Sequence, residues 1–199
     1  MPRLRPFRSG DEPALAEICL RTADEGADAT GMLGDDALWA ELFVLPYVAR
    51  HPDLAWVVET DDGHVAGYVV GTDDTAAFEE WFARDWWPRS ASREPRPAES
   101  VGRHAELLRY AASRGTGPHR YAEEYPAHLH IDLLPEVQGQ GWGRRLVGSL
   151  VARLRERGTP GLHLVASAGN TGAVAFYRRL GFDPLASEPG EQAFGMRLD

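Results

Sequence analysis

A glycine-rich loop between an apolar run and an amphipathic stretch carries the most informative chemistry in this sequence. Its glycines are Gly139, Gly141 and Gly143, and two arginines, Arg144 and Arg145, follow directly. Glycine permits backbone conformations that turn successive N–H groups inward, which creates a cradle for an anion. The helix predicted after the loop directs its positive N-terminal end at the same point. The loop therefore predicts a site for a pyrophosphate.

The spacing of the loop differs from that of two common phosphate-binding patterns. A Walker loop ends in Gly-Lys-Ser/Thr, and a dinucleotide fingerprint reads G-x-G-x-x-G, whereas this loop reads G-x-G-x-G and continues with arginine. A glycine-rich turn that binds nothing is the alternative interpretation of the loop alone. With its position after a strand-like run and before a helix, Gln138-x-x-Gly141-x-Gly143 resembles the acetyl-coenzyme A loop of the GNAT N-acetyltransferases.

A second segment resembles the other hallmark of that family. It reads Asn170-x-x-Ala173-x-x-Phe176-Tyr177-x-x-Leu180-Gly181-Phe182, and it follows a strand-like run at residues 162–166. The Gly-Asn turn signal at its start favours a helix that begins there. The two segments have the family's order and separation, and together they cover about a quarter of the chain.

The resemblance implies an α/β GNAT fold in which a central, mixed but mostly antiparallel twisted sheet is flanked by helices. Residues 1–199 are expected to form a single acetyltransferase domain with an insertion at about 73–126. The implied co-substrate is acetyl-coenzyme A, and no metal is expected. The residues expected to contact acetyl-coenzyme A are Leu133, Leu134, Gln138, Gly139, Gln140, Gly141, Trp142, Gly143, Arg144, Asn170, Phe176 and Tyr177.

Within that set, the resemblance assigns different tasks to different residues. The Leu133 N–H matches the backbone donor that stabilises the oxyanion of the tetrahedral intermediate. The amides from Gln138 to Arg144 would hold the pyrophosphate, and a Cβ on Gly141 or Gly143 would push it away. Trp142 is expected to pack into the core or beside the adenine. Asn170 would bond the cofactor or cap its helix.

The chemistry of acetyl transfer also requires proton donors and acceptors. Tyr177 matches the family tyrosine that protonates the leaving thiolate, and an unperturbed phenol with a pKa near ~10 stays protonated at neutral pH. A buried aromatic on a helix face is the alternative for this residue. For a base we select Asp132, which alternates with His128 and His130 on one strand face.

The assignment of the base leaves several alternatives open. Strand parity places Leu129, Ile131 and Leu133 on the acceptor side unless the strand bulges. Glu123 and Glu124 could act through water, and many family members need no dedicated base. Two imidazoles and one carboxylate without a third histidine at matching spacing argue against a metal.

Composition narrows the class of protein. The net charge of −9 argues against a nucleic-acid partner, because phosphate binding favours a basic surface. No apolar run is long enough to span a membrane, and the N-terminus has no apolar signal core, so we expect a cytoplasmic protein. The single cysteine, Cys19, excludes an intrachain disulfide. The sequence leaves open whether the protein forms a homodimer.

Periodicity and turn signals predict the remaining elements. We expect a strand at 4–7, a helix capped by Ser9 or Asp11, a helix at 35–43 and a hairpin with its turn at 61–63. Residues 78–86 and 106–112 are predicted as helices, and 88–101 as an exposed loop. The aromatic-rich insertion at 73–126 is interpreted as a satellite core, with a lid over the acceptor pocket as the alternative.

Two weaker patterns concern the relatives and the acceptor. Motifs such as Thr22-x-Asp24-x-Gly26 and Gly67-Tyr68-x-x-Gly71-Thr72 look like the acetyltransferase-like C-terminal domain of O-GlcNAcase. The segment 22–49 is acidic and lacks arginine, which could attract a cationic amine, although an ordinary acidic surface is the favoured interpretation. Its acidic residues are Asp24, Glu25, Asp28, Asp35, Asp36 and Glu41.

Taken together, the sequence predicts an N-acetyltransferase that transfers acetyl from acetyl-coenzyme A to a primary amine in a direct ternary complex. The acceptor is expected to be a small molecule or a peptide. The competing hypothesis is a catalytically inactive module that binds acetyl-coenzyme A or serves as a scaffold. The Gln138 loop and Tyr177 favour the enzyme.

Overall fold

A seven-stranded sheet organises the computed structural model, which describes residues 1–91 and 101–198. The strand order is β1-β2-β3-β4-β5-β7-β6, and every neighbouring pair is antiparallel except β4 and β5. The strands are β1 (Arg3–Pro6), β2 (Ala55–Glu59), β3 (Val65–Thr72), β4 (Ala127–Leu133), β5 (Gly161–Ser167), β6 (Asp183–Leu185) and β7 (Glu191–Arg197). The predicted mixed, mostly antiparallel sheet is confirmed.

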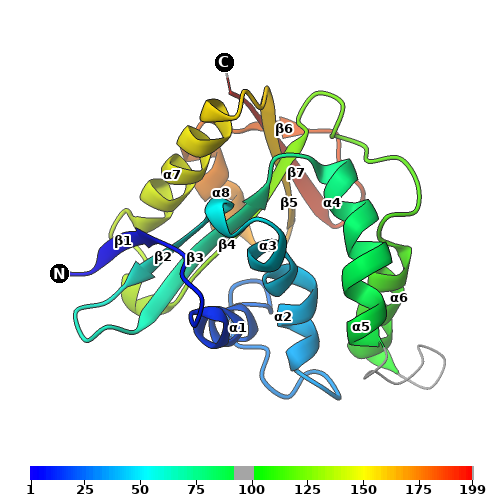
Figure 1. Ribbon diagram of the computed structural model, residues 1–199, viewed down its shortest axis with the longest axis horizontal. Coiled ribbons are helices and arrows are strands. Elements are labelled where there is room, and N and C mark those ends of the chain that lie inside the picture. Colours follow the sequence, from blue (N-terminus) through cyan, green and yellow to red (C-terminus); the bar gives the residue numbers. More distant parts are fainter. Residues whose placement is uncertain (92–100, 199) are drawn as a thin grey trace.

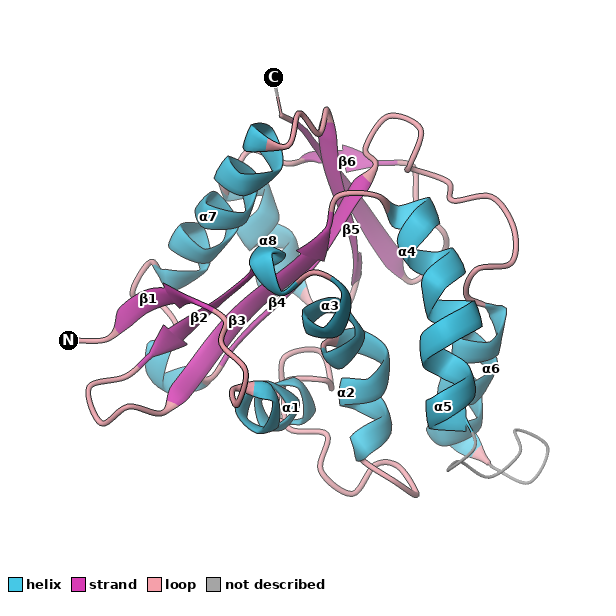
Figure 2. Ribbon diagram, viewed as in Figure 1, coloured by secondary structure: helices cyan, strands magenta, loops and turns pink. Residues whose placement is uncertain are grey.

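Helices cover both faces of this sheet (Figure 1). One face carries α1 (Glu12–Leu20), α2 (Ala37–Phe43) and α3 (Leu45–Arg50), and the other carries α7 (Trp142–Glu156) and α8 (Thr171–Arg179). The remaining helices, α4 (Thr75–Trp81), α5 (Trp87–Ala91) and α6 (Gly102–Ser113), stand together beside the sheet (Figure 2). None of the helices in the described ranges is long and apolar enough to cross a membrane.

The described parts of the insertion, residues 73–91 and 101–126, belong to the main core and are not a separate satellite. Phe78 of α4 is fully buried and stacks on Tyr47 of α3, with ring centroids 4.4 Å apart. Arg114, which follows α6, donates two hydrogen bonds to Glu79 and one to the Leu42 carbonyl. Residues 88–91 are helical where a loop was predicted at 88–101, and residues 92–100 of that loop lie outside the described residues.

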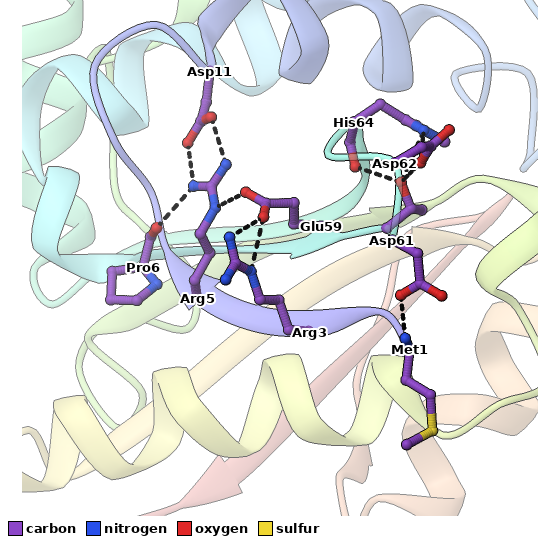
Figure 3. Close-up of polar contacts among 10 residues, drawn as sticks. Met1, Arg3, Arg5, Pro6, Asp11, Glu59, Asp61, Asp62 and His64 are labelled. Carbon is purple, nitrogen blue, oxygen red and sulfur yellow. Dashed lines mark hydrogen bonds and ion pairs between the residues drawn. The ribbon is translucent and has the colours of Figure 1, made fainter.

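The N-terminal strand is fixed to the sheet by a partly buried ion-pair network (Figure 3). The Arg5 guanidinium donates to both carboxylate oxygens of Asp11 at 2.7 and 2.8 Å, and its Nε donates to Glu59. Asp11 precedes α1 as predicted, but its side chain makes no capping hydrogen bond. Its carboxylate accepts instead from Arg5 and from the Arg8 amide.

Candidate active site

The central strands β4 and β5 separate after their first residues. They pair in parallel only at Ala127–Leu162 and His128–His163. The Leu134 amide donates to Ala66 on β3 at 2.8 Å, and hydrogen-bonding direction alternates along a strand. The backbone groups of Ile131 and Leu133 therefore face away from β3, toward the opening. The Leu133 carbonyl accepts from the Gln138 side chain at 2.8 Å, which agrees with this orientation.

The glycine-rich loop closes one end of this opening. Gly139 and Gly141 have φ values of +72° and +82°, and a Cβ on either would meet no atom within 4 Å. Gly141 precedes α7, and the Arg145 amide bonds to its carbonyl. The amides before Arg145 lie in the first turn, where a helix offers them no acceptor. The Gln138 amide, which was expected to hold the pyrophosphate, instead donates a hydrogen bond to the Pro135 carbonyl within a turn.

Gly143 is required for a reason that differs from the expected one. Its backbone is ordinary helix, and a Cβ there would lie 2.9 Å from Cζ and 3.0 Å from Cε2 of Phe176. The absent side chain therefore makes room for the Phe176 ring on α8. In contrast, Gly139 and Gly141 border open space and supply the left-handed backbone of the loop.

A cleft of about 630 Å³ brings the two sequence motifs together. Most of the predicted site residues line it: Asp132, Leu133, Gln138, Gly139, Gly141, Trp142, Gly143, Arg144, Asn170, Phe176 and Tyr177. Leu134 does not line it, because its side chain is buried and its amide is paired with β3. Gln140 does not line it either, and its side chain donates to the Glu136 carbonyl.

Trp142 and the helix cap Asn170 have clear local roles. Trp142 is buried, as expected for packing into the core, and the Arg145 guanidinium lies 4.2 Å from its ring centroid. The Asn170 side chain accepts from the Ala173 amide at 2.9 Å, so it caps α8. Capping fixes where this helix starts and hence where Tyr177 lies.

Tyr177 lies at the wall of the cleft, packed against Phe176, Phe182 and Phe194. Burial raises the pKa of its phenol, and the negative charge of Asp132 raises it further. The phenol is therefore protonated over the whole physiological range. A protonated hydroxyl beside the cleft is available to act as a proton donor.

Asp132 lies on the face of β4 that contacts α1. Its carboxylate accepts a hydrogen bond from Tyr68 on β3 and is also stabilised by Thr22. Burial nevertheless raises the pKa of this carboxyl group, because desolvation disfavours the charged form. A carboxylate with a raised pKa binds a proton more readily than an exposed one.

The two faces of β4 have different surroundings. Leu129, Ile131 and Leu133 share a face with α7, as shown by the close approach of Gly67 to Leu133 and of Gly71 to Leu150. His128, His130 and Asp132 face α1, α2 and α3. The alternation of side chains along the strand had placed Leu129, Ile131 and Leu133 on the acceptor side. The even-numbered residues, however, face the layer of helices that contains the acidic segment 22–49, which could attract a cationic amine.

The other candidates for a base or metal ligand lie elsewhere. Glu124 pairs with Arg197 at 3.0 Å, and neither Glu123 nor Glu124 lines the cleft. His128 and His130 both bond to the Tyr47 hydroxyl, at 2.6 and 3.1 Å. Within residues 1–91 and 101–198, no group of three or more histidine, cysteine or acidic side chains is placed to hold a metal.

Sequence reasoning missed part of the site. Thr22 and Gly26, from the loop after α1, line the cleft beside Glu25, which the predicted acidic segment did include, and Tyr68 bonds to Asp132. The Glu-Gly turn signal was visible in the sequence, and Gly26 has a φ of +96°. The pairing of Tyr68 with Asp132 follows from the β3–β4 register, which no local pattern determines.

Comparison with known families decides the classification. The family model described as "Acetyltransferase (GNAT) family" matches residues 22–182. The chain belongs to this family. The crystal structure of SsHAT matches the GNAT chain with a TM-score of 0.90 and 38% identity, and the match covers 100% of this chain and 98% of that one.

More distant relatives agree with this classification. Mycothiol acetyltransferase of Streptomyces griseus is 29% identical over 86% of this chain, which spans 45% of that relative's length. The structure of yncA from Salmonella typhimurium with its cofactor acetyl-CoA shares the fold, with a TM-score of 0.57 and 17% identity. That match covers 100% of this chain and 94% of the other. The narrower resemblance to the O-GlcNAcase domain stays a prediction.

Proposed function

We propose that this chain transfers the acetyl group of acetyl-coenzyme A to a primary amine in a direct ternary complex, with residues 1–199 acting as one domain. The observation that carries the proposal is a single cleft. It holds a loop and helix N-terminus suited to a pyrophosphate, an opening between β4 and β5, a protonated Tyr177 and the Asp132 carboxylate.

The cleft fits acetyl-coenzyme A in shape and charge. Space at Gly139 and Gly141 leaves the loop open to a diphosphate, and the first amides of α7 point to the same place. Arg144 and Arg179 line the cleft and can add positive charge. The outward-facing backbone of Ile131 and Leu133 can pair with the amide-containing pantetheine arm.

In the proposed reaction, the amine nitrogen attacks the thioester carbon and the carbon–nitrogen bond forms. The carbonyl electron pair moves to oxygen, and the Leu133 N–H stabilises the resulting oxyanion. When the tetrahedral intermediate collapses, the carbon–sulfur bond breaks and Tyr177 donates its proton to sulfur. Asp132 accepts the proton that nitrogen loses, and proton exchange with solvent restores both groups.

The acceptor is proposed to be cationic because of one carboxylate, that of Glu25. Glu25 lines the cleft with Asp132 and accepts from Ser167 on β5 at 2.5 Å. Its φ is +53°, the only positive value for a non-glycine residue in the described ranges, and such a conformation costs on the order of 1 kcal/mol or more. No ion pair of the described residues involves Glu25.

The other five acidic residues of the segment do not line the cleft. Asp28 accepts from Thr30, and Glu41 accepts from Ser90. Asp35 and Asp36 accept backbone hydrogen bonds from Ala37 and Gly31, and neither these four residues nor Asp24 lines the cleft. Glu25 is therefore the member of the segment that we propose to attract an amine.

A test of this function measures thiol release from acetyl-coenzyme A with four amines: agmatine, spermidine, glucosamine and an alanine-terminated tripeptide. We expect turnover with at least one amine, and formation of its acetamide by mass spectrometry. If acetyl-coenzyme A binds but none of these or a wider set of amines is acetylated, the inactive binding module is the better description.

The role of Glu25 is tested by replacing it with glutamine. A carboxylate attracts a cation, and dissolved salt screens this attraction. Glu25→Gln should therefore lower kcat/KM for the best cationic amine, and kcat/KM of the variant should fall less as the salt concentration rises. Asp35→Asn is the matched control, because Asp35 lies in the same acidic segment but outside the cleft. An unchanged salt dependence in Glu25→Gln, or preference for a neutral acceptor, would contradict the assignment.

A further inference from the structure

Two exposed arginines, Arg144 and Arg179, line one end of the cleft, and the reaction proposed above assigns no ligand group to either of them. Arg144 lies in the first turn of α7, and Arg179 is the last residue of α8. Arg144 Nη2 lies 3.5 Å from the Arg179 carbonyl oxygen, so the two helix ends meet here. We call this part of the cleft, formed by Arg144, Arg179 and Leu180, the arginine end.

The two guanidinium groups have no acidic partner, although the chain carries a net charge of −9. In the part of the chain that the structure describes, no ion pair includes Arg144 or Arg179. Farther along α7, in contrast, Arg153 and Arg157 both pair with Asp53. Neighbouring cations repel each other, and an anion that contacts both relieves this repulsion. The arginine end therefore fits a negatively charged group of a ligand.

The opposite end of the cleft has the opposite charge. A Cβ on Gly169 would lie 2.8 Å from Glu25 Oε1, so the Glu25 carboxylate lies beside the start of α8. This helix has nine residues and is therefore about 13 Å long, with Arg179 at its far end. A phosphate is repelled by the carboxylate and attracted by the arginines, so the charges of the cleft select one orientation of an anionic ligand.

The proposed position of acetyl-coenzyme A leaves one of its phosphates without a binding group. The loop with Gly139 and Gly141 and the first amides of α7 hold the pyrophosphate, and the pantetheine arm runs from there between β4 and β5. The adenosine is attached to the other side of the pyrophosphate, so it extends away from this opening. Its ribose carries a 3′-phosphate a few bonds from the pyrophosphate. Arg144 follows the loop directly, and Arg179 lies beside it.

We propose that Arg144 and Arg179 bind the 3′-phosphate of coenzyme A and so make the protein prefer coenzyme A to dephospho-coenzyme A. This role rests on the acetyl-coenzyme A site proposed above and adds no step to the reaction. A phosphate monoester carries a charge of about −2 at neutral pH. Arginine suits it because the guanidinium donates hydrogen bonds from a planar fork. The motif of α8 leaves position 179 open, so the sequence pattern did not select Arg179.

The test compares two ligands that differ only in the 3′-phosphate, by calorimetry at about neutral pH and about 0.1 M salt. We expect the wild type to bind coenzyme A about tenfold more tightly than dephospho-coenzyme A, because charge-assisted hydrogen bonds on an exposed surface are partly screened. Arg144→Gln and Arg179→Gln should each weaken the binding of coenzyme A about threefold and leave the Kd of dephospho-coenzyme A unchanged. The variant with both substitutions should bind the two ligands equally.

Arg178→Gln is the matched control, because Arg178 is the exposed neighbour of Arg179 on α8 but does not line the cleft. It should bind both ligands as the wild type does. The preference of the wild type should also shrink as salt rises from about 0.1 M to about 1 M, since the Debye length falls from ~10 Å to ~3 Å.

Several results would overturn this assignment. One is an equal Kd of the wild type for the two ligands, and another is a preference that does not change with salt. A third is an equal loss of affinity for both ligands in Arg144→Gln and Arg179→Gln, which would assign the arginines to the pyrophosphate. Equal binding of the two ligands by the wild type refutes the role of the arginines alone, whereas failure to bind either ligand refutes the acetyl-coenzyme A site as well.

Discussion

Replacing Gly143 by alanine distinguishes two explanations of the last glycine in the loop. The resemblance attributed this glycine to space for the diphosphate, whereas the structure places the Phe176 ring 2.9 Å from the position of an added Cβ. Overpacking by one methyl group costs about 1–3 kcal/mol. Because the contacting atoms are the far end of a ring that can swing, we expect the lower part of this range, about 1–2 kcal/mol.

The expected effect is measurable without any ligand. In a chain of this size, 1 kcal/mol changes Tm by about 2–4 °C, so Gly143→Ala should lower Tm by about 2–8 °C. The displaced ring also enters the cleft, and we expect weaker binding of coenzyme A by calorimetry. Adding Phe176→Leu should restore both stability and affinity. Loss of affinity without loss of stability, unrelieved by Phe176→Leu, would refute the packing explanation and favour the diphosphate.

Two further predictions concern charged groups and pH. The folded-state pKa of Asp132 is raised, so the stability of the wild type falls as the pH rises through the titration of this carboxyl group. Asp132→Asn lacks the titrating group, so its Tm minus that of the wild type should increase from pH 3.5 to 7. A difference in Tm that stays constant over this range would contradict the prediction. Arg5→Leu leaves Asp11 and Glu59 without their shared cation and should cost about 2–4 kcal/mol at pH 7 by denaturant titration. Because Arg5 lowers the pKa of Asp11, this cost should shrink as pH falls below about 4, and a cost that is the same at pH 3 would argue against an ionic origin.

Local patterns predicted much of the fold. The Asp61-Asp62-Gly63 turn between alternating apolar residues predicted the β2–β3 hairpin, and Gly63 has the left-handed φ that such a turn needs. The Gly139–Gly143 loop and the Asn170 cap were also predicted, because their geometry depends on residues close in sequence. The C-terminal strands β6 and β7 and the short helix α3 were not predicted.

The rest depends on contacts between distant segments. The reason for Gly143 lies 33 residues away in Phe176, and the environment of Asp132 comes from Tyr68 on a neighbouring strand. Parity showed that His128, His130 and Asp132 share a face, but not which layer of helices that face meets. Only the three-dimensional arrangement reduces the acidic segment to Glu25, because its other five acidic residues do not line the cleft.

The central claim, that this cleft catalyses acetyl transfer with Tyr177 as the proton donor, is tested most directly by Tyr177→Phe. The measurement is steady-state thiol release with the best amine, together with the Kd of acetyl-coenzyme A by calorimetry. The account predicts a fall in kcat of roughly 10²–10⁴-fold, with little change in Kd, because only a hydroxyl group is removed. A variant that turns over as fast as the wild type would contradict it.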